Sequence, residues 1–316
     1  SVINIVTLEP IFKPEKPINL DFSFTGGSFG LLNPYLLFEN RIKKQKNEDD
    51  SYYSWSLKLN YLQSDGNYPF DLHYGNRNND SISREKRINS DVKNLNGEVN
   101  FYAHFNKHSK LTAKVYYYWS KRGLPGAVIY YNTNSAQRLN NQNAFAQVHY
   151  ENFFTPKVAY QVNAKFNYDQ TQYLDPTYHN IEGKLDNQYI QREYYLSNSV
   201  QYQPFKQWNI VLSNDLFYNN MDANLNSFAK PKRFNCLTVL AMTFTSKYIN
   251  VSANLLHTYV LNKVAVGEAA KNQSHWSPSA GITIKPLGDN HLIMRMFYKN
   301  IFRMPSFNDL YYREVG

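Results

Sequence analysis

The sequence is poor in the residues that several common protein classes need. Cys236 is the single cysteine in 316 residues, which excludes an internal disulfide and a cysteine-rich zinc site. The 13 glycines and 13 prolines are too few for a collagen-like or low-complexity chain. The sequence also lacks any run of about 18 apolar residues, which an α-helical membrane protein would need. These shortages exclude all four classes.

Aromatic residues are abundant by contrast. The 27 Tyr, 20 Phe and 4 Trp make up 16% of the chain, although only 42% of it is hydrophobic and the mean hydropathy is −0.59. Disordered chains are poor in aromatics, so we expect a folded chain. The net charge of +9 is spread along the sequence without a nucleic-acid-binding motif. We therefore expect no nucleic-acid partner, and a cationic exterior facing an anionic bacterial surface would account for the excess.

Alternation of apolar and polar residues is the main pattern along the chain. In the segment 157–168, the even-numbered positions from Val158 to Tyr168 are apolar or aromatic, and the odd-numbered positions are mostly Lys, Gln and Asn. Segments 52–62, 110–120 and 249–255 repeat the pattern. A period of two predicts β-strands with one apolar and one polar face.

The connections between these segments alternate in length. Short connections fall at Asn106–Lys110, Phe154–Lys157, Gln203–Gln207, Thr245–Lys247 and Pro286–Asn290, and long polar ones at about 63–94, 121–139, 170–187, 219–231 and 262–275. A meander with short turns at one end and long loops at the other is typical of outer-membrane barrels.

Strand length supports the same interpretation. The expected strands run about ten to fourteen residues, and twelve residues tilted by about 40–45° rise about 28 Å, close to the thickness of a bilayer's hydrocarbon core. Backbone polar groups in a bilayer must all be paired, so such a sheet must close on itself. We predict an all-β, antiparallel up-and-down transmembrane β-barrel. A soluble β-sandwich or propeller is the alternative, because its strands also alternate.

The motifs that suggest chemistry are weak. Gly26–Gly30 matches the G-x-S-x-G nucleophile elbow of hydrolases, but a strand-like run follows where that motif needs a helix. His104 and His108 are four apart at a strand end and turn, where this spacing does not bring two ligands together. We therefore expect no catalytic residue, no metal ligand and no cofactor, and a protein that is not an enzyme.

The first two long loops mix aromatic and cationic residues. Such groups can hold an amphipathic or anionic ligand by stacking and charge-assisted hydrogen bonds, although an ordinary polar loop is an equal alternative. The candidate ligand-binding residues are Tyr68, Phe70, Arg77, Arg122, Tyr130 and Tyr131, and the same loops also carry Arg87 and Arg138.

Four stretches resemble one known family. They are SVINIVT (Ser1–Thr7), INLDFSFTGGSFG (Ile18–Gly30), KRGLPGAV (Lys121–Val128) and FRMPSFNDLYYREVG (Phe302–Gly316). In this order they are similar to the end of the plug domain, the first barrel hairpin, a loop and a mid-barrel signature of TonB-dependent outer-membrane transporters, particularly of the Bacteroidetes type. The signature residues are Arg303, Pro305, Ser306, Phe307, Asn308, Leu310 and Tyr311.

The resemblance implies an internal piece of a larger receptor. Residues 1–10 would be the last residues of a plug, and 11–316 a partial barrel of about 13 out of 22 strands. Because complete single-chain bacterial barrels have an even number of strands, we expect this chain alone to form an open sheet. The signal, the TonB box, most of the plug and the C-terminal strands would lie outside it.

The same resemblance implies a function in the outer membrane of a Gram-negative bacterium. The complete receptor would bind a scarce nutrient, a siderophore, haem, corrinoid or oligosaccharide, and import it in a TonB-driven step. Its partners would be the TonB complex, its own plug domain, outer-membrane lipid with lipopolysaccharide, and the small-molecule or oligosaccharide ligand. Two alternatives stay open: a passive porin, and a surface β-rich adhesin or glycan-binding module.

Overall fold

The computed structural model describes residues 8–13, 15–43, 51–76, 79–127, 134–288 and 291–311. These residues form fifteen strands and one short helix. Their bounds are β1 (Ile18–Gly27), β2 (Leu31–Lys43), β3 (Tyr52–Ser64), β4 (Pro69–Asn76), β5 (Asn79–Lys86), β6 (Val92–Asn106), β7 (Ser109–Gly123), β8 (Arg138–Thr155), β9 (Val158–Asp175), β10 (Leu185–Tyr202), β11 (Trp208–Ala223), β12 (Lys232–Thr245), β13 (Ile249–Lys263), β14 (Gln273–Ile284), β15 (Met294–Lys299) and α1 (Phe307–Tyr311).

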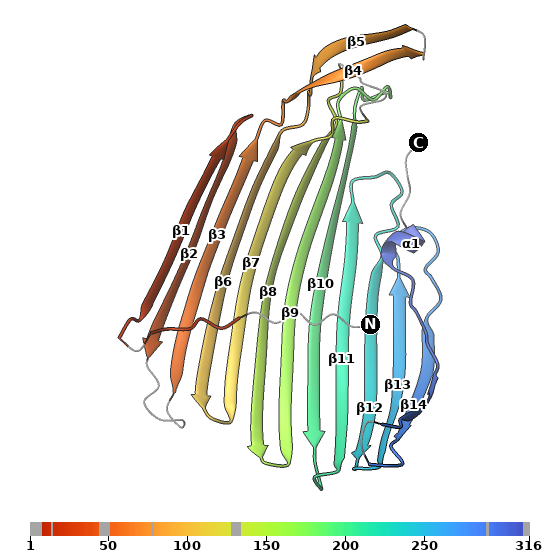
Figure 1. The fold of residues 1–316 in the computed structure, drawn as a ribbon. Coiled ribbons are helices and arrows are strands. Elements are labelled where there is room, and N and C mark those ends of the chain that lie inside the picture. The colour runs from red at the N-terminus through yellow and green to blue at the C-terminus, as the bar shows by residue number, and fades with distance from the viewer. Residues whose placement is uncertain are drawn as a thin grey trace.

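The strands build one large antiparallel sheet and one small hairpin (Figure 1). In the described residues the large sheet has thirteen strands in the order β1-β2-β3-β6-β7-β8-β9-β10-β11-β12-β13-β14-β15, which confirms the predicted meander. The order is linear, so β1 and β15 are the two edges of the sheet as described. That further strands complete a barrel stays a prediction.

The register places apolar side chains side by side on one face, which we call the outer face. From Leu20 of β1, successive Cα partners lead strand by strand to Leu261 of β13, and every residue in that row is apolar or aromatic. The row is Leu20, Phe38, Leu57, Val99, Val115, Ala146, Phe166, Tyr194, Tyr218, Phe234 and Leu261.

The opposite face, which we call the inner face, is polar over most of its width. The row of partners beginning at Asn19 is polar from β1 to β9 and turns aromatic and apolar towards β13. Its members are Asn19, Glu39, Ser56, Asn100, Lys114, Gln147, Lys165, Tyr195, Phe217, Asn235 and Val260.

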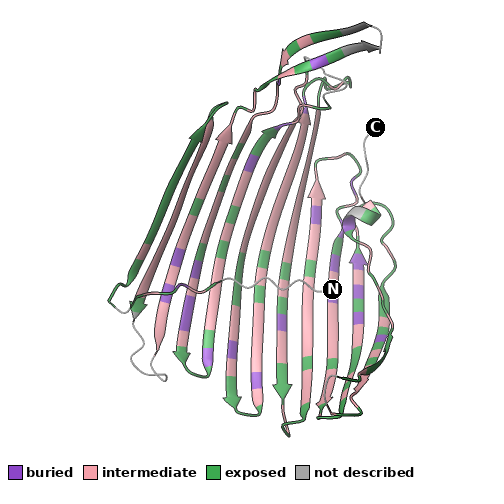
Figure 2. Cartoon of the chain, in the orientation of Figure 1, coloured by how far each residue is buried: buried purple, intermediate pink, exposed green. Residues whose placement is uncertain are grey.

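Burial on the two faces is the reverse of that in a water-soluble sheet. Inner-face polar residues such as Ser54, Asn100 and Arg233 are buried, whereas outer-face Val115 is 57% exposed. Figure 2 shows that β1 is exposed over nearly its whole length. A β-sandwich would cover the apolar face with a second sheet, and the described residues contain none that does. An uncovered apolar face of this kind is what the wall of a transmembrane barrel presents to lipid.

Two features differ from the sequence-based expectation. The strands β8, β9 and β10 each have 18 residues, longer than the expected ten to fourteen, and they extend into the segments predicted as loops. The connection predicted as a long polar loop over 63–94 instead contains the β4–β5 hairpin. Both differences arise because cross-strand hydrogen bonds continue wherever a neighbouring strand is present, whatever the local polarity.

The end of the described chain also differs. In the sequence, Leu292, Met294, Met296 and Tyr298 alternate with polar residues such as Arg295 and Lys299, which predicts a full strand over 290–302, but β15 has only six residues and pairs only with β14. After it, residues 300–306 lead to α1, whose first turn is capped by reciprocal hydrogen bonds between Ser306 and Asp309, each from a backbone N–H to a side-chain oxygen. No helix in the described residues is long and apolar enough to cross a membrane.

The glycine-rich segment Gly26–Gly30 is a hairpin turn, as expected. The strand β1 ends at Gly27 and β2 begins at Leu31, whose N–H donates to the Ser28 carbonyl across 3.3 Å. A strand follows the serine, so the helix that a nucleophile elbow needs is not there.

Candidate ligand-binding loops and inner wall

The two longest connections, 65–91 and 124–137, lie at the same end of the sheet (Figure 1). At the end drawn uppermost lie the β1–β2 turn and the long connections 65–91, 124–137, 176–184, 224–231 and 264–272. We call this the long-loop end, and the opposite one the short-turn end. Because barrel ligands are met by the external loops, the long-loop end is the candidate ligand-binding region.

An aromatic cluster lies at the long-loop end. The Tyr68 ring meets the Phe29 and Phe70 rings in edge-to-face contacts, each with 6.4 Å between centroids. Tyr68 and Phe70 were predicted as ligand-binding residues, and the structure brings them together. Phe29 comes from the β1–β2 turn and was not predicted. Tyr68 is 44% exposed, so its ring remains available for stacking.

The other predicted ligand-binding residues do not join this cluster. Arg122 lies exposed near the end of β7, where its Cα partners are Val92 and Leu139. Arg77, Tyr130 and Tyr131 lie outside the described residues. Of the six predicted ligand-binding residues, the three that the structure describes are therefore one aromatic pair and a separate arginine.

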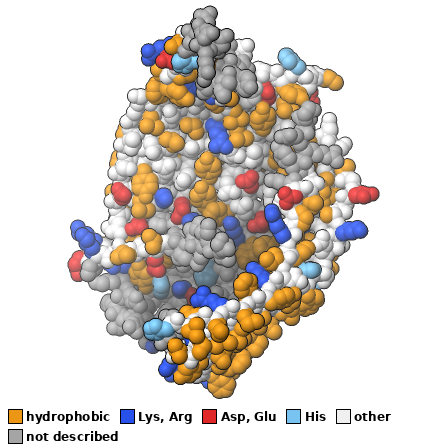
Figure 3. All heavy atoms as spheres, turned by 45° about the vertical axis from the view of Figure 1, so that its right-hand side comes forward, with side chains coloured by type: hydrophobic (Ala, Val, Ile, Leu, Met, Phe, Trp, Pro, Cys, Tyr) orange, Lys and Arg blue, Asp and Glu red, His pale blue; other side chains and the backbone are white. Residues whose placement is uncertain are grey.

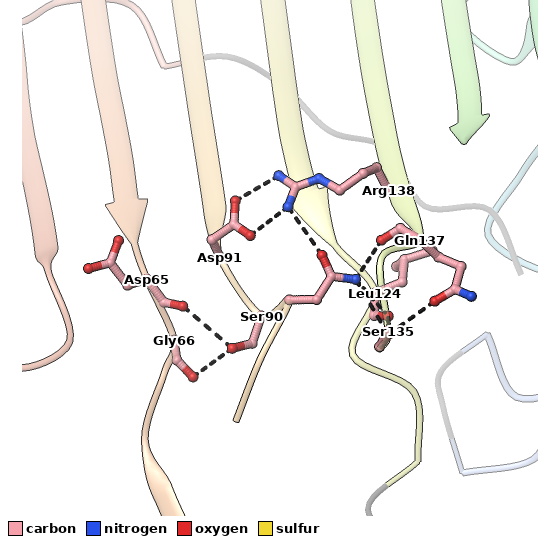
Figure 4. A network of polar contacts seen from close by, with 9 residues as sticks. Asp65, Gly66, Ser90, Asp91, Leu124, Ser135, Gln137 and Arg138 are labelled. Carbon is pink, nitrogen blue, oxygen red and sulfur yellow. Dashed lines mark hydrogen bonds and ion pairs between the residues drawn. The ribbon is translucent and has the colours of Figure 1, made fainter. Parts of the chain in front are cut away.

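A polar network ties two of the long connections and the end of β9 together at the long-loop end (Figure 4). Arg138 at the start of β8 forms a bidentate pair with Asp91, at 2.6 and 2.7 Å. The Asn89 amide donates to the Gln137 carbonyl across 2.8 Å, and Gln137 donates to Asp175 across 3.1 Å. Segments between β5 and β6, between β7 and β8, and at the end of β9 are thereby held at fixed separations.

The Arg138 guanidinium controls the ionisation of this network. Its hydrogen bonds are the main cause that lowers the pKa of Asp91 below its ordinary value; desolvation opposes the shift, and the positive charge of Arg138 adds to it. Both side chains are about one third exposed, at 31% and 35%, so solvent weakens the pair. The carboxylate is ionised at neutral pH and keeps accepting both bonds.

Two glycines permit the close approach of these segments. A Cβ on Gly66 would lie 2.4 Å from the Ser90 carbonyl oxygen, and one on Gly123 would lie 2.2 Å from the Asn89 carbonyl oxygen. Both obstacles are backbone atoms, so a larger residue would displace the chain itself. Loop spacing at this end therefore depends on glycine at both positions.

Arg87 anchors the same region from below. It is only 7% exposed, and one guanidinium nitrogen, Nη2, donates to the Gly126 carbonyl. Its Nη1 is buried without a hydrogen-bond partner among the described residues. The Arg87 N–H also donates to the Tyr68 carbonyl across 2.9 Å, which joins this anchor to the aromatic cluster.

The family-like signature segment lies against the inner face. Arg233 of β12, 5% exposed, donates to the Pro305 carbonyl and to Asn262 Oδ1, each across 2.7 Å. Its guanidinium carbon lies 4.9 Å from the centroid of the Phe307 ring. Phe307 in turn packs in a small core with Met221 and Phe228, and Tyr311 packs beside it.

The remaining signature residues differ in their surroundings. Arg303 and Leu310 are exposed, Ser306 caps α1, and the Asn308 side chain lies outside the description. The Tyr311 hydroxyl accepts a long hydrogen bond from the Ala270 N–H at 3.4 Å. Sequence reasoning missed Arg233. The only feature of the sequence that could have identified Arg233 is a charged residue at a position that faces the inner side of a strand.

The N-terminal segment also crosses the inner face. The Tyr102 hydroxyl donates to the Leu8 carbonyl across 3.1 Å, and His104 Nε2 lies 3.0 Å from Glu9 Oε1. Arg41 lies over the Phe12 ring at 5.4 Å. Tyr102, His104 and Arg41 all belong to the inner face, so both ends of the described chain rest on one side of the sheet.

The wall between these segments carries paired charges. Lys114 lies 3.0 Å from Glu98, and both side chains are less than 20% exposed. Asn100 donates to Glu98 across 2.7 Å and to Ser56 across 3.1 Å. Such a surface offers hydrogen bonds that water or a polar partner segment can replace at small net cost.

The two histidines that are four apart in the sequence have different surroundings. His104 pairs with Glu9, whereas His108 is in the β6–β7 turn. Among the described residues, no group of three or more His, Cys, Asp or Glu side chains is placed to hold a metal ion.

Comparison with known proteins gives a fold but no sequence family. No family model matches the chain, and neither does any curated protein. Among solved structures, the chain is similar to "Copper transporter OprC", with a TM-score of 0.61 and 12% identity. The match covers 87% of this chain and 43% of that one, so the chain spans less than half the length of its structural neighbour. At this identity the likeness shows the fold alone.

Proposed function

We propose that this chain forms part of the wall of an outer-membrane receptor that binds a scarce nutrient and imports it in a TonB-driven step. The observation that carries the proposal is the inverted sheet, with an exposed apolar outer face, a buried polar inner face and long connections gathered at one end. The shared fold with a protein named as a transporter supports it. No step in this function needs covalent chemistry, so we propose a protein that is not an enzyme.

Active import is favoured over a passive porin because the inner face is occupied. Arg233 holds the signature segment there, and Tyr102 and His104 hold residues 8 and 9. A porin needs an open, water-filled lumen along its wall. In the proposed receptor, residues 1–10 would be the last part of a plug, as the resemblance to the Bacteroidetes-type receptors implies, and the contacts of residues 8 and 9 with the inner face support this.

The side chains at the long-loop end indicate the general chemistry of the nutrient. Exposed Tyr68 and partly buried Phe70 provide aromatic surface, and exposed Arg122 provides positive charge at the same end of the sheet. These groups suit siderophores, haem, corrinoids and oligosaccharides, which offer planar or ring surfaces, often with anionic groups. The name of the structural neighbour adds a copper ion to the candidate cargoes.

A growth experiment tests the proposal. A strain lacking the gene is grown with limiting iron, haem, cobalamin, copper or a single oligosaccharide, and is complemented by the native gene or by a Tyr68→Ala, Phe70→Ala variant. We expect one nutrient to fail to support growth, the native gene to restore it, and the variant to restore it incompletely. Restored uptake in a strain without TonB would favour the porin.

The adhesin alternative has a separate test. A surface β-rich module would stay soluble without detergent after refolding of the full-length protein. We expect the full-length protein to need detergent or lipid, because outer-face residues such as Val115 and Leu212 are more than half exposed.

A further inference from the structure

We propose that the outer face at the short-turn end of β11, β12 and β13 is a binding site for an anionic phospholipid. One acyl chain occupies an apolar hollow, and the phosphate lies between Lys206 and Lys247. This inference goes beyond the proposed transport function and rests only on the membrane placement within it.

The hollow is apolar on every side. It has a volume of about 320 Å³ and is lined by Trp208, Met242, Phe244, Val251 and Ala253. The register explains its shape, because Trp208, Phe244 and Val251 form one row of partners and Met242 faces Ala253 in another. The partner of Ala253 on β14 is Ala280, so two small residues lie side by side and leave a depression between larger ones.

An apolar hollow on this face needs an apolar occupant. Trp208 and Val251 are each 38% exposed, and this exposed apolar surface contributes free energy when an acyl chain covers it. Trp208 is the first residue of β11 and Phe244 the last but one of β12, so the hollow opens at the edge of the membrane. Indole rings favour that position, where the ring is apolar and the N–H meets water.

The charge at this end identifies the headgroup. Four short turns at this end, those after β6, β8, β10 and β12, each carry one lysine and no acidic residue: the lysines are Lys107, Lys157, Lys206 and Lys247. The long connections mix both signs, for example Asp91, Glu182 and Lys184. Basic residues at a membrane surface attract anionic lipids. A second copy of this chain would bring the same lysines and be repelled.

The two lysines lie in the two turns that adjoin the hollow, Lys206 between β10 and β11 and Lys247 between β12 and β13. Both are exposed, and Lys206 is two residues before Trp208. A hydrogen bond of 2.8 Å from the Thr245 N–H to the Gln207 carbonyl holds the two turns next to each other. Lys247 Nζ lies 5.4 Å from the centroid of the Tyr248 ring, in the same turn. Figure 3 shows hydrophobic side chains gathered over the lower part of the right-hand strands, at this end of the sheet.

Brominated lipids provide the test, because bromine on an acyl chain quenches a tryptophan that it touches. The full-length protein is reconstituted in nanodiscs with brominated phosphatidylglycerol or brominated phosphatidylcholine in a background of ordinary phosphatidylcholine. The quenching that disappears in Trp208→Phe is the part that reports on Trp208. We expect Trp208 to reach half-maximal quenching at a lower fraction of brominated phosphatidylglycerol than of brominated phosphatidylcholine. At low salt the two fractions should differ by about fivefold for each lysine.

Charge variants decide whether the lysines select the headgroup. In Lys206→Gln, Lys247→Gln, the preference for phosphatidylglycerol is expected to fall to about one, with Trp208 still quenched by both lipids. The matched control, Lys184→Gln, Lys271→Gln at the long-loop end, removes the same charge and should keep the preference. Equal quenching by both lipids in the native protein overturns the proposed site. Absence of quenching by either lipid overturns the membrane placement itself, which separates the two failures.

Discussion

The two faces of the large sheet are formed by the same strands but differ in the side chains that they require. The outer face presents apolar rows such as Val115, Ala146 and Phe166, with few directed contacts. The inner face carries ion pairs and hydrogen bonds, and it receives two chain segments through Arg233 and Tyr102. The outer face therefore needs only hydrophobicity, whereas the inner face needs particular side chains at particular positions.

The largest expected effect comes from placing one charge on each face of the same strand. Ala146 is on the outer face in the middle of β8, and Gln147, next to it, is on the inner face. We expect Ala146→Arg to lower the free energy of unfolding in lipid vesicles by about 2–4 kcal/mol, because an arginine is desolvated at the bilayer midplane. Denaturant unfolding followed by tryptophan fluorescence measures it.

The matched variant is Gln147→Arg. Gln147 belongs to the inner face, and its own side chain is exposed. Its effect is expected to be within about 0.5 kcal/mol, as for other surface changes. Equal losses for Ala146→Arg and Gln147→Arg would contradict the assignment of the two faces.

The next largest effect tests whether the inner face holds its segments through single anchors. In Arg233→Met the Pro305 carbonyl and Asn262 Oδ1 both lose a charged donor, which costs about 2 kcal/mol. We expect the signature segment to detach locally, so trypsin cleaves faster after the exposed Arg303. Limited proteolysis with mass spectrometry measures this rate.

A suitable control is Lys165→Met, which removes an inner-face cation that lies over the Phe145 ring and touches neither segment. Cleavage after Arg303 should be unchanged there. Unchanged cleavage in Arg233→Met as well would show that the segment is held without this anchor.

A smaller effect concerns the polar network at the long-loop end, where the pair of Asp91 and Arg138 is only partly shielded. We expect Arg138→Gln to cost about 1 kcal/mol, less than a fully buried charged hydrogen bond. Folding lowers the pKa of Asp91 below its ordinary value of 3.8. The contribution is thus complete above about that pH and is lost as the pH falls through the lower folded value.

The pH dependence supplies the measurement. The difference in unfolding free energy between the native chain and Arg138→Gln should be constant near neutral pH and should shrink at strongly acidic pH. A difference that instead grew on acidification would contradict the ion pair.

The smallest expected effect comes from replacing an outer-face asparagine by leucine, and it is to be compared with the same change on the inner face. Asn214 lies on the outer face and donates to Thr238 Oγ1 across 2.8 Å, so polar groups do occur there when they satisfy each other. We expect Asn214→Leu to change stability in lipid by less than about 1 kcal/mol, because a lipid-facing leucine offsets the lost hydrogen bond. The same change at buried Asn100 on the inner face should be clearly destabilising, since Glu98 and Ser56 lose a donor.

The sequence predicted the strands well and the site only in part. Alternation identified the two faces and the thirteen-strand meander, because lipid on one side imposes a period of two on each strand. Tyr68 and Phe70 were predicted separately as ligand-binding residues, and only the structure shows that their rings are in contact. Asn89, Asp91 and Gln137 were not singled out, since polar residues in a polar loop give no signal until their partners are known. The β4–β5 hairpin was missed for the same reason.

What the sequence determined by itself is local: which residues are apolar at every second position, and where the chain turns. Those features depend on near neighbours, and a hydrophobic period survives without knowledge of the partner strand. The tertiary structure decided which distant residues meet. Arg233 and Pro305 are 72 residues apart, and Tyr102 and Leu8 are 94 apart, yet hydrogen bonds join both pairs. Contacts of this kind depend on the register and curvature of the whole sheet, and no local pattern encodes them.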